Sequence, residues 1–531
     1  MNVEPKNPDI KPDGTTPPVL NSMDGLSDGR PVSARVFPTR NAPVKGLANR
    51  AIKGTLFLSS QAMLSRVVSI LGTLTLSMLL IPESYGQVAL ANIFGNVISL
   101  VATPGFDTFL IQRGRRHKPW VNPIFWLTAI SGAVGLGVIL LLAPVCSWLY
   151  QDNTIGDLMI WSGVTTFFAA IATVPLGLLN LRMQFGRLAL FNFMAATAWV
   201  SITVALAWLG FGPYSFVMSG PILSPIWLIL LFYWARPKIR RPMQLSRVRK
   251  AAPRVGLILG SKLGPMVVSQ GDYLVLGAAV SKHEVGVYFW AFSMATQLPR
   301  VLAQQIISVI TPVMGQMHNE GSRQINATLR GMRLAGAISW PLVFLQATCG
   351  TEVLRWMFSA RWSEAFVPFQ LLSIAIGGEA VMGVMYGLLV ARSRNAALMT
   401  LSLLFGALFL LTVGIGAFAG GVVGCATAVL VFYLLYPAPW LFIGLRGDKD
   451  VNVLSLLPLV YLPILAALPA FFAAEGIRRL LIEQPRAVIL LAMTIGFFIA
   501  LWIGLRVVTP AALSELINST RPLVSRVLKR K

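Results

Sequence analysis

Residues 401–418 read Leu-Ser-Leu-Leu-Phe-Gly-Ala-Leu-Phe-Leu-Leu-Thr-Val-Gly-Ile-Gly-Ala-Phe, a stretch without a charged side chain. A helix rises about 1.5 Å per residue, so about 20 mostly apolar residues cross the roughly 30 Å of hydrocarbon in a bilayer. The strands of a membrane β-barrel alternate apolar with polar residues, and this stretch does not. Similar segments follow one another from about Gly54 to Val507. The pattern therefore predicts an all-α polytopic membrane protein.

The composition of the 531 residues indicates the same class of protein. Hydrophobic residues make up 55% of the chain and charged residues 12%, with a mean hydropathy of +0.70, which excludes an ordinary soluble domain. Cys146, Cys349 and Cys425 lie in or near different hydrophobic segments without metal-ligand spacing, and the chain has no GxxxxGKS or GxxxxGKT phosphate loop. We therefore expect no metal and no cofactor.

Apolar segments long enough to cross the bilayer predict about fourteen membrane spans. They lie near 54–81, 84–111, 120–149, 157–181, 187–211, 214–235, 255–280, 284–314, 329–350, 364–391, 396–417, 419–445, 453–474 and 486–507. The predicted segments are a disordered cytoplasmic tail at 1–53, an N-lobe of six helices at 54–235, a basic cytoplasmic linker at 236–254, a C-lobe of six helices at 255–446, two further helices at 453–507 and a basic C-terminal tail at 508–531.

The distribution of Lys and Arg predicts the orientation in the membrane. Alternate connections are basic, and short basic loops stay on the cytoplasmic side. The basic residues of these connections include Arg113, Arg115, Arg116, Lys118, Arg182, Arg187, Arg236, Arg254, Arg323, Arg330, Arg333, Arg392, Arg394, Arg446 and Lys449. Both termini are therefore expected in the cytoplasm, although Arg478 and Arg479 fall in a predicted outer loop. We interpret the net charge of +24 as contact with anionic membrane lipids and not with nucleic acid.

Two short repeats relate the first six spans to the later ones. Residues 81–91 read IPESYGQVALA and residues 281–291 read SKHEVGVYFWA, with a Gly and the final Ala in register. Residues 177–182 read GLLNLR and residues 387–392 read GLLVAR. Six spans return the chain to the same side, so the two lobes are expected to be parallel repeats, an arrangement that suits alternating access.

Five short motifs resemble those of polysaccharide-export flippases of the Wzx type, members of the multidrug/oligosaccharidyl-lipid/polysaccharide (MOP) superfamily. They are LLIPESYG at 79–86 followed by PGFDTFLIQR at 104–113, DYLVLG at 272–277 followed by GVY at 286–288, and FSARWSEA at 358–365. Ser359 and Ala360 stand where the family more often has a Gly. The resemblance covers roughly residues 54–450, and the last two spans match by number alone.

The resemblance implies a MOP/MATE-like fold and a function. It implies that the chain is not an enzyme but moves polyprenyl-pyrophosphate-linked oligosaccharide from the inner to the outer leaflet of a bacterial inner membrane. This cargo would serve surface polysaccharide or exopolysaccharide synthesis. A polysaccharide polymerase or export complex would then be a further partner.

Ionisable residues inside predicted spans are the candidate binding residues. A charge at the bilayer centre costs about 2.5–3.5 kcal/mol on insertion scales, so it faces a cavity or a partner. The candidates for binding pyrophosphate or acidic sugars are Arg66, Lys262 and Arg300, with Gln304 one turn after Arg300. Gln61, Gln270 and Gln297 offer hydrogen bonds to sugar hydroxyls. The structural alternative is that each cation forms a structural pair or extends to the membrane surface.

Asp272 and Glu379 are the acids placed well inside predicted spans. Either residue would couple transport to an ion gradient if burial raised its pKa into the working range, or would neutralise a nearby cation. Both interpretations stay open on the sequence alone.

Other functions compete with this prediction. An ion-coupled small-molecule or drug exporter of the same superfamily would use the same carboxylates but usually has about twelve spans, and a lipid II flippase is nearer in class. A membrane glycan polymerase or glycosyltransferase needs acids and bases at a membrane face. The longest predicted outer connection, about 351–364, has only a dozen residues and no such cluster.

Overall fold

The computed structural model describes residues 44–103, 105–106, 110, 118–182, 184–239, 245–300, 321–358, 360–392, 395–445, 456–510 and 514. The first helices are α1 (Val44–Leu79), α2 (Pro82–Ala102), η2 (Lys118–Trp120), α4 (Val121–Leu149), α5 (Asn153–Leu181), α6 (Phe185–Trp208) and α7 (Tyr214–Ala235). They are followed by α8 (Leu245–Ala279), α9 (Lys282–Ala295), α11 (Gly321–Leu345), η3 (Gln346–Gly350), α12 (Thr351–Met357), η4 (Ala360–Ala365), α13 (Phe366–Ala375), η5 (Ile376–Gly378), α14 (Glu379–Ala391), α15 (Asn395–Leu435), α16 (Pro437–Gly444), α17 (Leu457–Leu480) and α18 (Arg486–Val508). Residues 1–43 of the predicted disordered tail, Gln304 and most of the predicted C-terminal tail lie outside the described residues, whereas residues 44–53 of that tail belong to α1.

Eleven helical stretches of the described chain are long and apolar enough to cross a membrane. This confirms the predicted all-α, multi-pass membrane protein. Eleven stretches do not test the count of fourteen spans directly, because one of them, Leu398–Ile443, has 46 residues and covers two predicted spans. A kink at Gly420 and Gly421 divides it, and Gly421 has a φ of +58° that a residue with a Cβ adopts only with strain.

Helix ends differ from the prediction at three places. α1 begins at Val44 and α8 at Leu245, inside segments expected to be a disordered tail and a linker. α9 ends at Ala295 and helix resumes at residues 297–300, and the rest of the predicted eighth span lies outside the described residues. The expected outer connection at 351–364 is mostly helical, because α12 continues η3 and η4 begins at Ala360. Arg478 and Arg479 lie in the last turn of α17.

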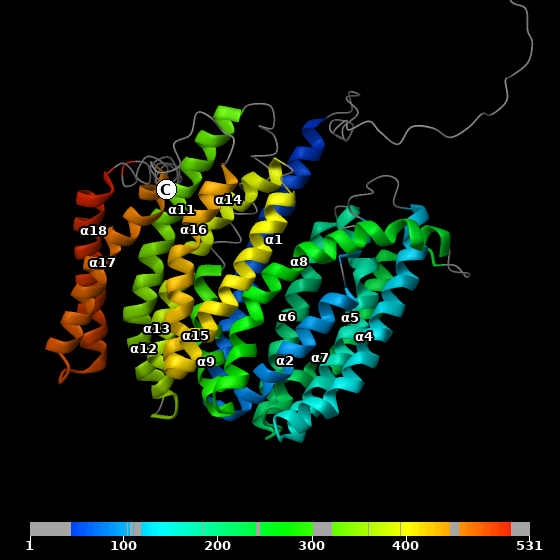
Figure 1. Cartoon of the computed structure of the whole chain (residues 1–531), viewed down its shortest axis with the longest axis horizontal. Helices are drawn as coiled ribbons and strands as arrows, with labels where there is room; N and C mark the ends of the chain where they lie inside the picture. The colour runs from blue at the N-terminus through cyan, green and yellow to red at the C-terminus, as the bar shows by residue number, and fades with distance from the viewer. Residues whose placement is uncertain are drawn as a thin grey trace, which may run out of the picture. The chain divides into compact units, whose positions relative to one another are not determined.

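The described residues from Ala51 onward form one compact unit. Within this unit, α2 packs against α4 and α5, and α7 packs against α5 and α6. α15 packs along α8, α11 packs against α14 and α17, and α17 pairs with α18. Figure 1 shows α2 and α4–α7 as one group and α11–α18 as another, with α8 running from the first group into the second. We call α1–α7 the N-half and α8–α18 the C-half.

The two halves meet closely where α2 crosses α9. Gly86 and Gly286, which the first sequence repeat aligns, lie back to back: a Cβ built on Gly86 would be 1.9 Å from the carbonyl oxygen of Lys282. A Cβ on Gly286 would be 1.8 Å from the carbonyl oxygen of Pro82. Only glycine permits this approach of the two backbones. The register that the sequence indicated therefore marks a real contact between the repeated turns.

Candidate functional site

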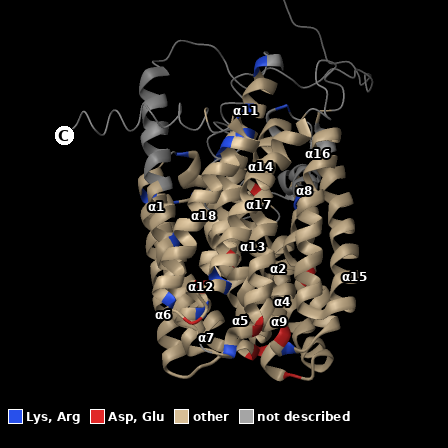
Figure 2. Ribbon diagram, turned by 90° about the vertical axis from the view of Figure 1, so that its left-hand side faces the viewer, with Lys and Arg blue, Asp and Glu red and all other residues tan. Residues whose placement is uncertain are grey.

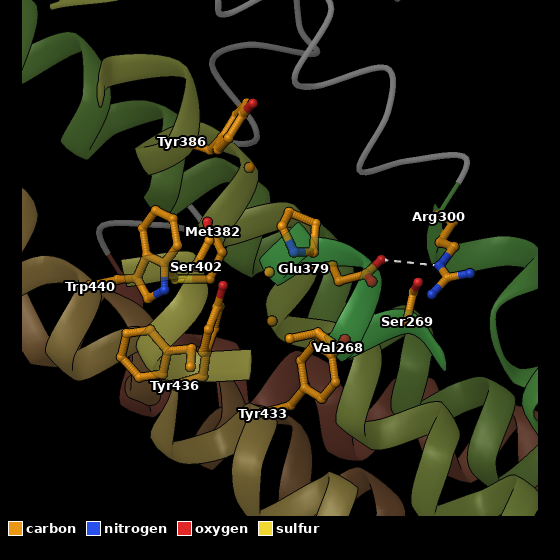
Figure 3. A pocket seen from close by; sticks show the side chains of 15 residues that line it. Val268, Ser269, Arg300, Glu379, Met382, Tyr386, Ser402, Tyr433, Tyr436 and Trp440 are labelled. Carbon is orange, nitrogen blue, oxygen red and sulfur yellow. Dashed lines mark ion pairs between the residues drawn. The ribbon is translucent and has the colours of Figure 1, made fainter. Parts of the chain in front are cut away.

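A cavity of about 450 Å³ lies among α8, α14, α15 and α16 of the C-half (Figure 3). Its lining residues are Gly264, Pro265, Val268, Ser269, Arg300, Gly378, Glu379, Met382, Gly383, Tyr386, Ser402, Phe405, Tyr433, Tyr436 and Trp440. Pockets of a few hundred cubic ångströms with an apolar lining and a few convergent polar groups are typical ligand sites. Two of the sequence candidates, Arg300 and Glu379, lie in this lining.

Arg300 and Glu379 form an ion pair in the cavity wall. The distance from Arg300 Nε to Glu379 Oε2 is 3.5 Å, and the two side chains are 34% and 25% exposed. The Arg300 guanidinium also lies 5.3 Å from the ring centroid of Phe292, within the range of a cation–π contact. The pair compensates two charges that would each be costly within the membrane, and it leaves both partly accessible.

Glu379 owes its position to an interruption between α13 and α14. The three-residue turn η5 (Ile376–Gly378) separates the two helices, and the hydroxyl of Ser339 donates a hydrogen bond to the carbonyl oxygen of Gly377. A Cβ on Gly377 would lie 2.7 Å from the Trp340 ring, so glycine is needed for α11 to approach. Glu379 is then the first residue of α14 and reaches the cavity.

Arg300 follows a break in the eighth predicted span. Pro299 has no N–H, so the carbonyl oxygen of Ala295 loses its helical partner, and Gln346 Nε2 donates to this oxygen at 2.8 Å. Arg66 on α1 donates from Nε to the carbonyl oxygen of Gln297 at 3.0 Å and from Nη2 to that of Thr296 at 3.3 Å. The break is therefore held from both halves of the molecule.

Arg66 thus contacts backbone carbonyls beside the cavity and does not line the cavity itself. The backbone carbonyl oxygen of Gln297 accepts the hydrogen bond from Arg66. The side-chain Oε1 of Gln297 is buried without a hydrogen-bond partner among the described residues. Gln61 Nε2 donates to Ser65 Oγ at 2.7 Å, within α1. In this structure the contacts of Arg66 and Gln61 are structural.

Lys262 and Gln270 lie on α8, the helix that supplies Pro265 and Ser269 to the cavity. Lys262 is three residues before Pro265 and seven before Ser269, so it lies on the same face one turn away, and it is half-buried. No described residue forms an ion pair with it. Gln270 is half-buried and is not part of the lining.

Asp272 lies in the core of the C-half and not in the cavity. Its side chain is 1% exposed, and its Oδ2 accepts a hydrogen bond of 2.8 Å from the Tyr288 hydroxyl. The Tyr288 and Tyr273 rings pack edge to face beside it. Among the described Lys and Arg residues, none forms an ion pair with Asp272.

The aromatic wall of the cavity was missed by the sequence argument. Tyr436 and Trp440 lie across the cavity from Arg300 in Figure 3, with Tyr433 below Glu379. Phe405 is a further aromatic residue of the lining. The spacing 433, 436 and 440 places three aromatic rings on one helical face, which is the signal that would have found them. On the sequence alone, this spacing is equally typical of an ordinary packing face.

Polar side chains surround the crossing of α2 and α9, and we call this region the α2/α9 junction. Lys282 Nζ and Gln87 Nε2 each lie 2.9 Å from Asp152 Oδ2. The ring nitrogens of His283 lie 3.1 Å from Glu83 Oε1 and 3.2 Å from Glu364 Oε2. Figure 2 shows red and blue segments of ribbon gathered near α9, at one end of the bundle.

Buried aromatic residues lie beneath this polar layer. Trp290 Nε1 donates to Ser77 Oγ at 2.6 Å and Trp362 Nε1 donates to the carbonyl oxygen of Ser77 at 2.9 Å. The two indoles stack at 4.8 Å, and Tyr85 packs edge to face on Trp362. The α2/α9 junction is therefore held closed by packed aromatic side chains as well as by ion pairs.

Asp152 carries a strongly shifted pKa at this junction. Burial acts to raise the pKa of Asp152, but hydrogen bonds from Gln87, Lys282 and Thr154 outweigh it and lower the pKa from 3.8 to about 2. Asp152 is also the N-cap of α5 and accepts from the backbone N–H of Thr154. Its carboxylate is charged throughout the physiological pH range.

Solved transporters share this arrangement of helices. The structure of the lipid II flippase MurJ in an inward closed conformation matches with a TM-score of 0.64 and 11% identity, covering 85% of this chain and 99% of that one. An inward-facing MATE family transporter of the MOP superfamily matches with a TM-score of 0.56 and 14% identity, covering 74% and 95%. At such low identities these matches show the fold alone, and they confirm the predicted MOP/MATE-like fold.

Sequence comparison gives the family. Residues 75–367, more than half of the chain, match the family described as polysaccharide biosynthesis protein, and the chain belongs to that family. The succinoglycan biosynthesis transport protein ExoT of Rhizobium meliloti (strain 1021) is 23% identical over 303 residues, which are 57% of this chain. The match spans 61% of that relative, less than two thirds of its length.

Proposed function

We propose that the protein is a flippase that moves polyprenyl-pyrophosphate-linked oligosaccharide from the inner to the outer leaflet of the bacterial inner membrane. The Arg300–Glu379 pair in the wall of an intramembrane cavity is the observation that carries the proposal. A charged pair is retained there, at the cost of removing it from water, where a polar cargo needs hydrogen-bonding groups. The family match and the transport function in the relative's name support the same conclusion.

Alternating access explains the close contact at the α2/α9 junction. In the proposed cycle this junction faces the outside, keeps the outer entrance closed while cargo binds, and separates to release cargo. Both termini then lie in the cytoplasm, where the basic loops contact anionic lipids and the cargo is made. The polyprenyl tail stays in the bilayer, and a polysaccharide polymerase or export complex receives the oligosaccharide outside.

Of the two candidate acids, Glu379 and Asp272, we propose that Asp272 couples this cycle to an ion gradient. Glu379 already pairs with a fixed cation, Arg300, so a mobile ion would compete with the guanidinium for its carboxylate. Asp272 has only the Tyr288 hydroxyl and a backbone N–H as described partners. We therefore retain Asp272 as the proposed coupling residue.

The test is made on the lipid-linked glycan pool of a deletion strain. We expect polyprenyl-linked repeat units to accumulate while surface polysaccharide falls, and the intact gene to restore both. Arg300→Gln should fail to restore them, whereas Arg479→Gln, which removes a side chain that is 75% exposed, should succeed. An unchanged glycolipid pool with altered sensitivity to cationic drugs would contradict the proposal and favour a drug exporter.

A further inference from the structure

We propose that the cavity among α8, α14, α15 and α16 binds a single sugar ring of the cargo, held between its aromatic wall and the Arg300–Glu379 pair. This inference rests on the function proposed above and adds the part of the cargo that the C-half recognises. The aromatic wall, the polar wall and the rigidity of the cavity each support it independently.

The aromatic wall offers faces suited to a sugar. The Phe405 ring lies 4.8 Å from Tyr436 and 6.4 Å from Trp440, and the Tyr436 and Trp440 rings are 5.6 Å apart. A pyranose ring presents C–H groups on its faces, and their partial positive charge complements the negative face of an aromatic ring. These three adjacent rings line the cavity and give it an apolar surface for one such face.

The opposite wall offers the hydrogen bonds that the rim of a sugar requires. Sugar hydroxyls both donate and accept, and the guanidinium of Arg300 only donates whereas the carboxylate of Glu379 only accepts. Figure 3 shows the two side chains pointing toward each other across from the rings, with Ser269 beside them. Charge-assisted hydrogen bonds of this kind are the stronger ones.

The same polar wall makes the cavity a poor binding site for the polyprenyl tail of the cargo. An apolar chain in the cavity would displace water from the ion pair and from the hydroxyls of Ser402, Tyr433 and Tyr436 without replacing its hydrogen bonds. Polar groups left unpaired in this way oppose binding. The volume of about 450 Å³ suits a small polar ring and lies near the lower end of the range for ligand pockets.

The cavity is also held open by its frame. α8 and α15 cross so closely that a Cβ on Gly264 would lie 2.5 Å from the backbone of Ser402, and a Cβ on Gly271 would lie 2.6 Å from Leu410. Such packing fixes the two walls before a ligand arrives. A preformed site loses less conformational entropy on binding.

The test measures binding of the sugar and of the lipid separately, on the purified full chain in nanodiscs. The probes are the oligosaccharide released by mild acid from the organism's own lipid-linked pool and polyprenyl phosphate without sugar. Trp440→Leu should weaken oligosaccharide binding at least tenfold and leave polyprenyl phosphate binding unchanged. Trp208→Leu, which removes an indole that is 77% exposed on α6, is the matched control and should change neither.

A second variant, Ser269→Leu, keeps the test valid if Trp440→Leu misfolds. Ser269→Leu adds volume to the open cavity without removing a packed side chain, and it should weaken oligosaccharide binding by a similar factor. Wild-type binding of the oligosaccharide by both variants would overturn the proposal. Loss of polyprenyl phosphate binding in both would also overturn it, since the cavity would then be a lipid site.

The same variants in cells separate the two proposals. If deletion of the gene leaves the glycolipid pool unchanged, the flippase function itself fails. If the pool accumulates on deletion and Trp440→Leu and Ser269→Leu both restore export fully, the flippase function stands and the sugar site alone is overturned. Accumulation that neither variant relieves, with relief by Trp208→Leu, is the expected result.

Discussion

Arg66 joins α1 to the interrupted helix that carries Arg300, by donating to the carbonyl oxygens of Thr296 and Gln297. A guanidinium satisfies both acceptors at once because its donors form a planar fork. The residue that the sequence suggested as a cargo ligand therefore acts here on the backbone. Its position determines where Arg300 enters the cavity.

We predict that Arg66→Ala lowers the melting temperature of the purified protein, because it leaves two partly buried carbonyl groups without their donor. Each loss costs about 1–3 kcal/mol for a buried group and less for one that water reaches. Lys262→Ala is the control, since no described residue pairs with Lys262, and it should leave the melting temperature unchanged. Equal melting temperatures for Arg66→Ala and wild type would refute this structural role.

Asp152 and Lys282 join the two halves at the α2/α9 junction. Asp152→Asn should shift the closed junction toward opening by roughly two- to five-fold, because a partly exposed ion pair contributes about 0.5–1 kcal/mol. The shift is measured by spin-label distances across the junction. Exchange of the two charges, Asp152→Lys with Lys282→Asp, should recover most of the closed population, and no recovery would argue against a direct pair.

The pKa of Asp152 gives this contribution a definite pH window. Since the pKa is lowered to about 2 in the closed state, closure is favoured fully above about pH 4 and loses this contribution as the pH falls toward 2. Between pH 5 and 8 the Asp152 contribution is constant. A change in the Asp152→Asn effect within that range would contradict the assignment.

The residues of the site were predictable only in part. Arg300 and Glu379 stood out because charges are costly in apolar spans, but their pairing depends on the break at Pro299 and the turn η5, which bring together residues 79 positions apart. The partner of Arg66 is a backbone carbonyl some 230 residues away, and no pattern in the sequence signals a carbonyl acceptor. Buried charges can be found from the sequence. Their partners can be identified only once the packing of the helices is known.

At the scale of elements, the α2/α9 crossing depends on two glycines. Gly86→Ala would place a methyl group 1.9 Å from the carbonyl oxygen of Lys282, so the helices must separate. Overpacking of this kind costs about 1–3 kcal/mol. We predict that Gly86→Ala populates the open junction in the same spin-label measurement.

Gly137→Ala is the matched control for this prediction. Gly137 lies within α4, and a Cβ there meets no atom within 4 Å. It should leave the junction closed and slightly stabilise the helix, because Ala is the better helix former by about 1 kcal/mol. A closed junction in Gly86→Ala would show that the crossing does not need the glycine.

The helices themselves were largely predictable, because a run of about 20 apolar residues leaves few alternatives to a membrane-spanning helix. The kink at Gly420 and Gly421 falls where the prediction ended one span and began the next. The errors lie where polar segments continue a helix, as at Leu245 in α8 and Thr351 in α12. Hydropathy indicates which residues lie in the hydrocarbon and not where helical hydrogen bonding starts or stops, so it began α8 too late and ended the ninth span too early.

Across the whole molecule, two distant regions are linked through α9. The α2/α9 junction closes one end of the bundle through both halves, while the cavity lies in the C-half beside the helix break that Arg66 holds. α9 and its continuation connect them, since Lys282, His283 and Gly286 begin the helix and Arg300 follows its end. A change in the angle between α2 and α9 would therefore move Arg300 relative to Glu379.

The most direct measurement of the central claim is flipping by the purified protein in proteoliposomes that contain the organism's lipid-linked oligosaccharide. A membrane-impermeant oxidant labels sugars on the outer leaflet, and the double variant Glu83→Cys with His283→Cys places thiols on either side of the α2/α9 junction for a short, reducible crosslinker. We predict that labelling exceeds the outer-leaflet half with wild-type protein, stops at that half when the junction is crosslinked, and resumes after reduction. Labelling that stops at the outer-leaflet half with folded, uncrosslinked wild-type protein would contradict flipping, and labelling that continues past that half after crosslinking would contradict the role of the junction.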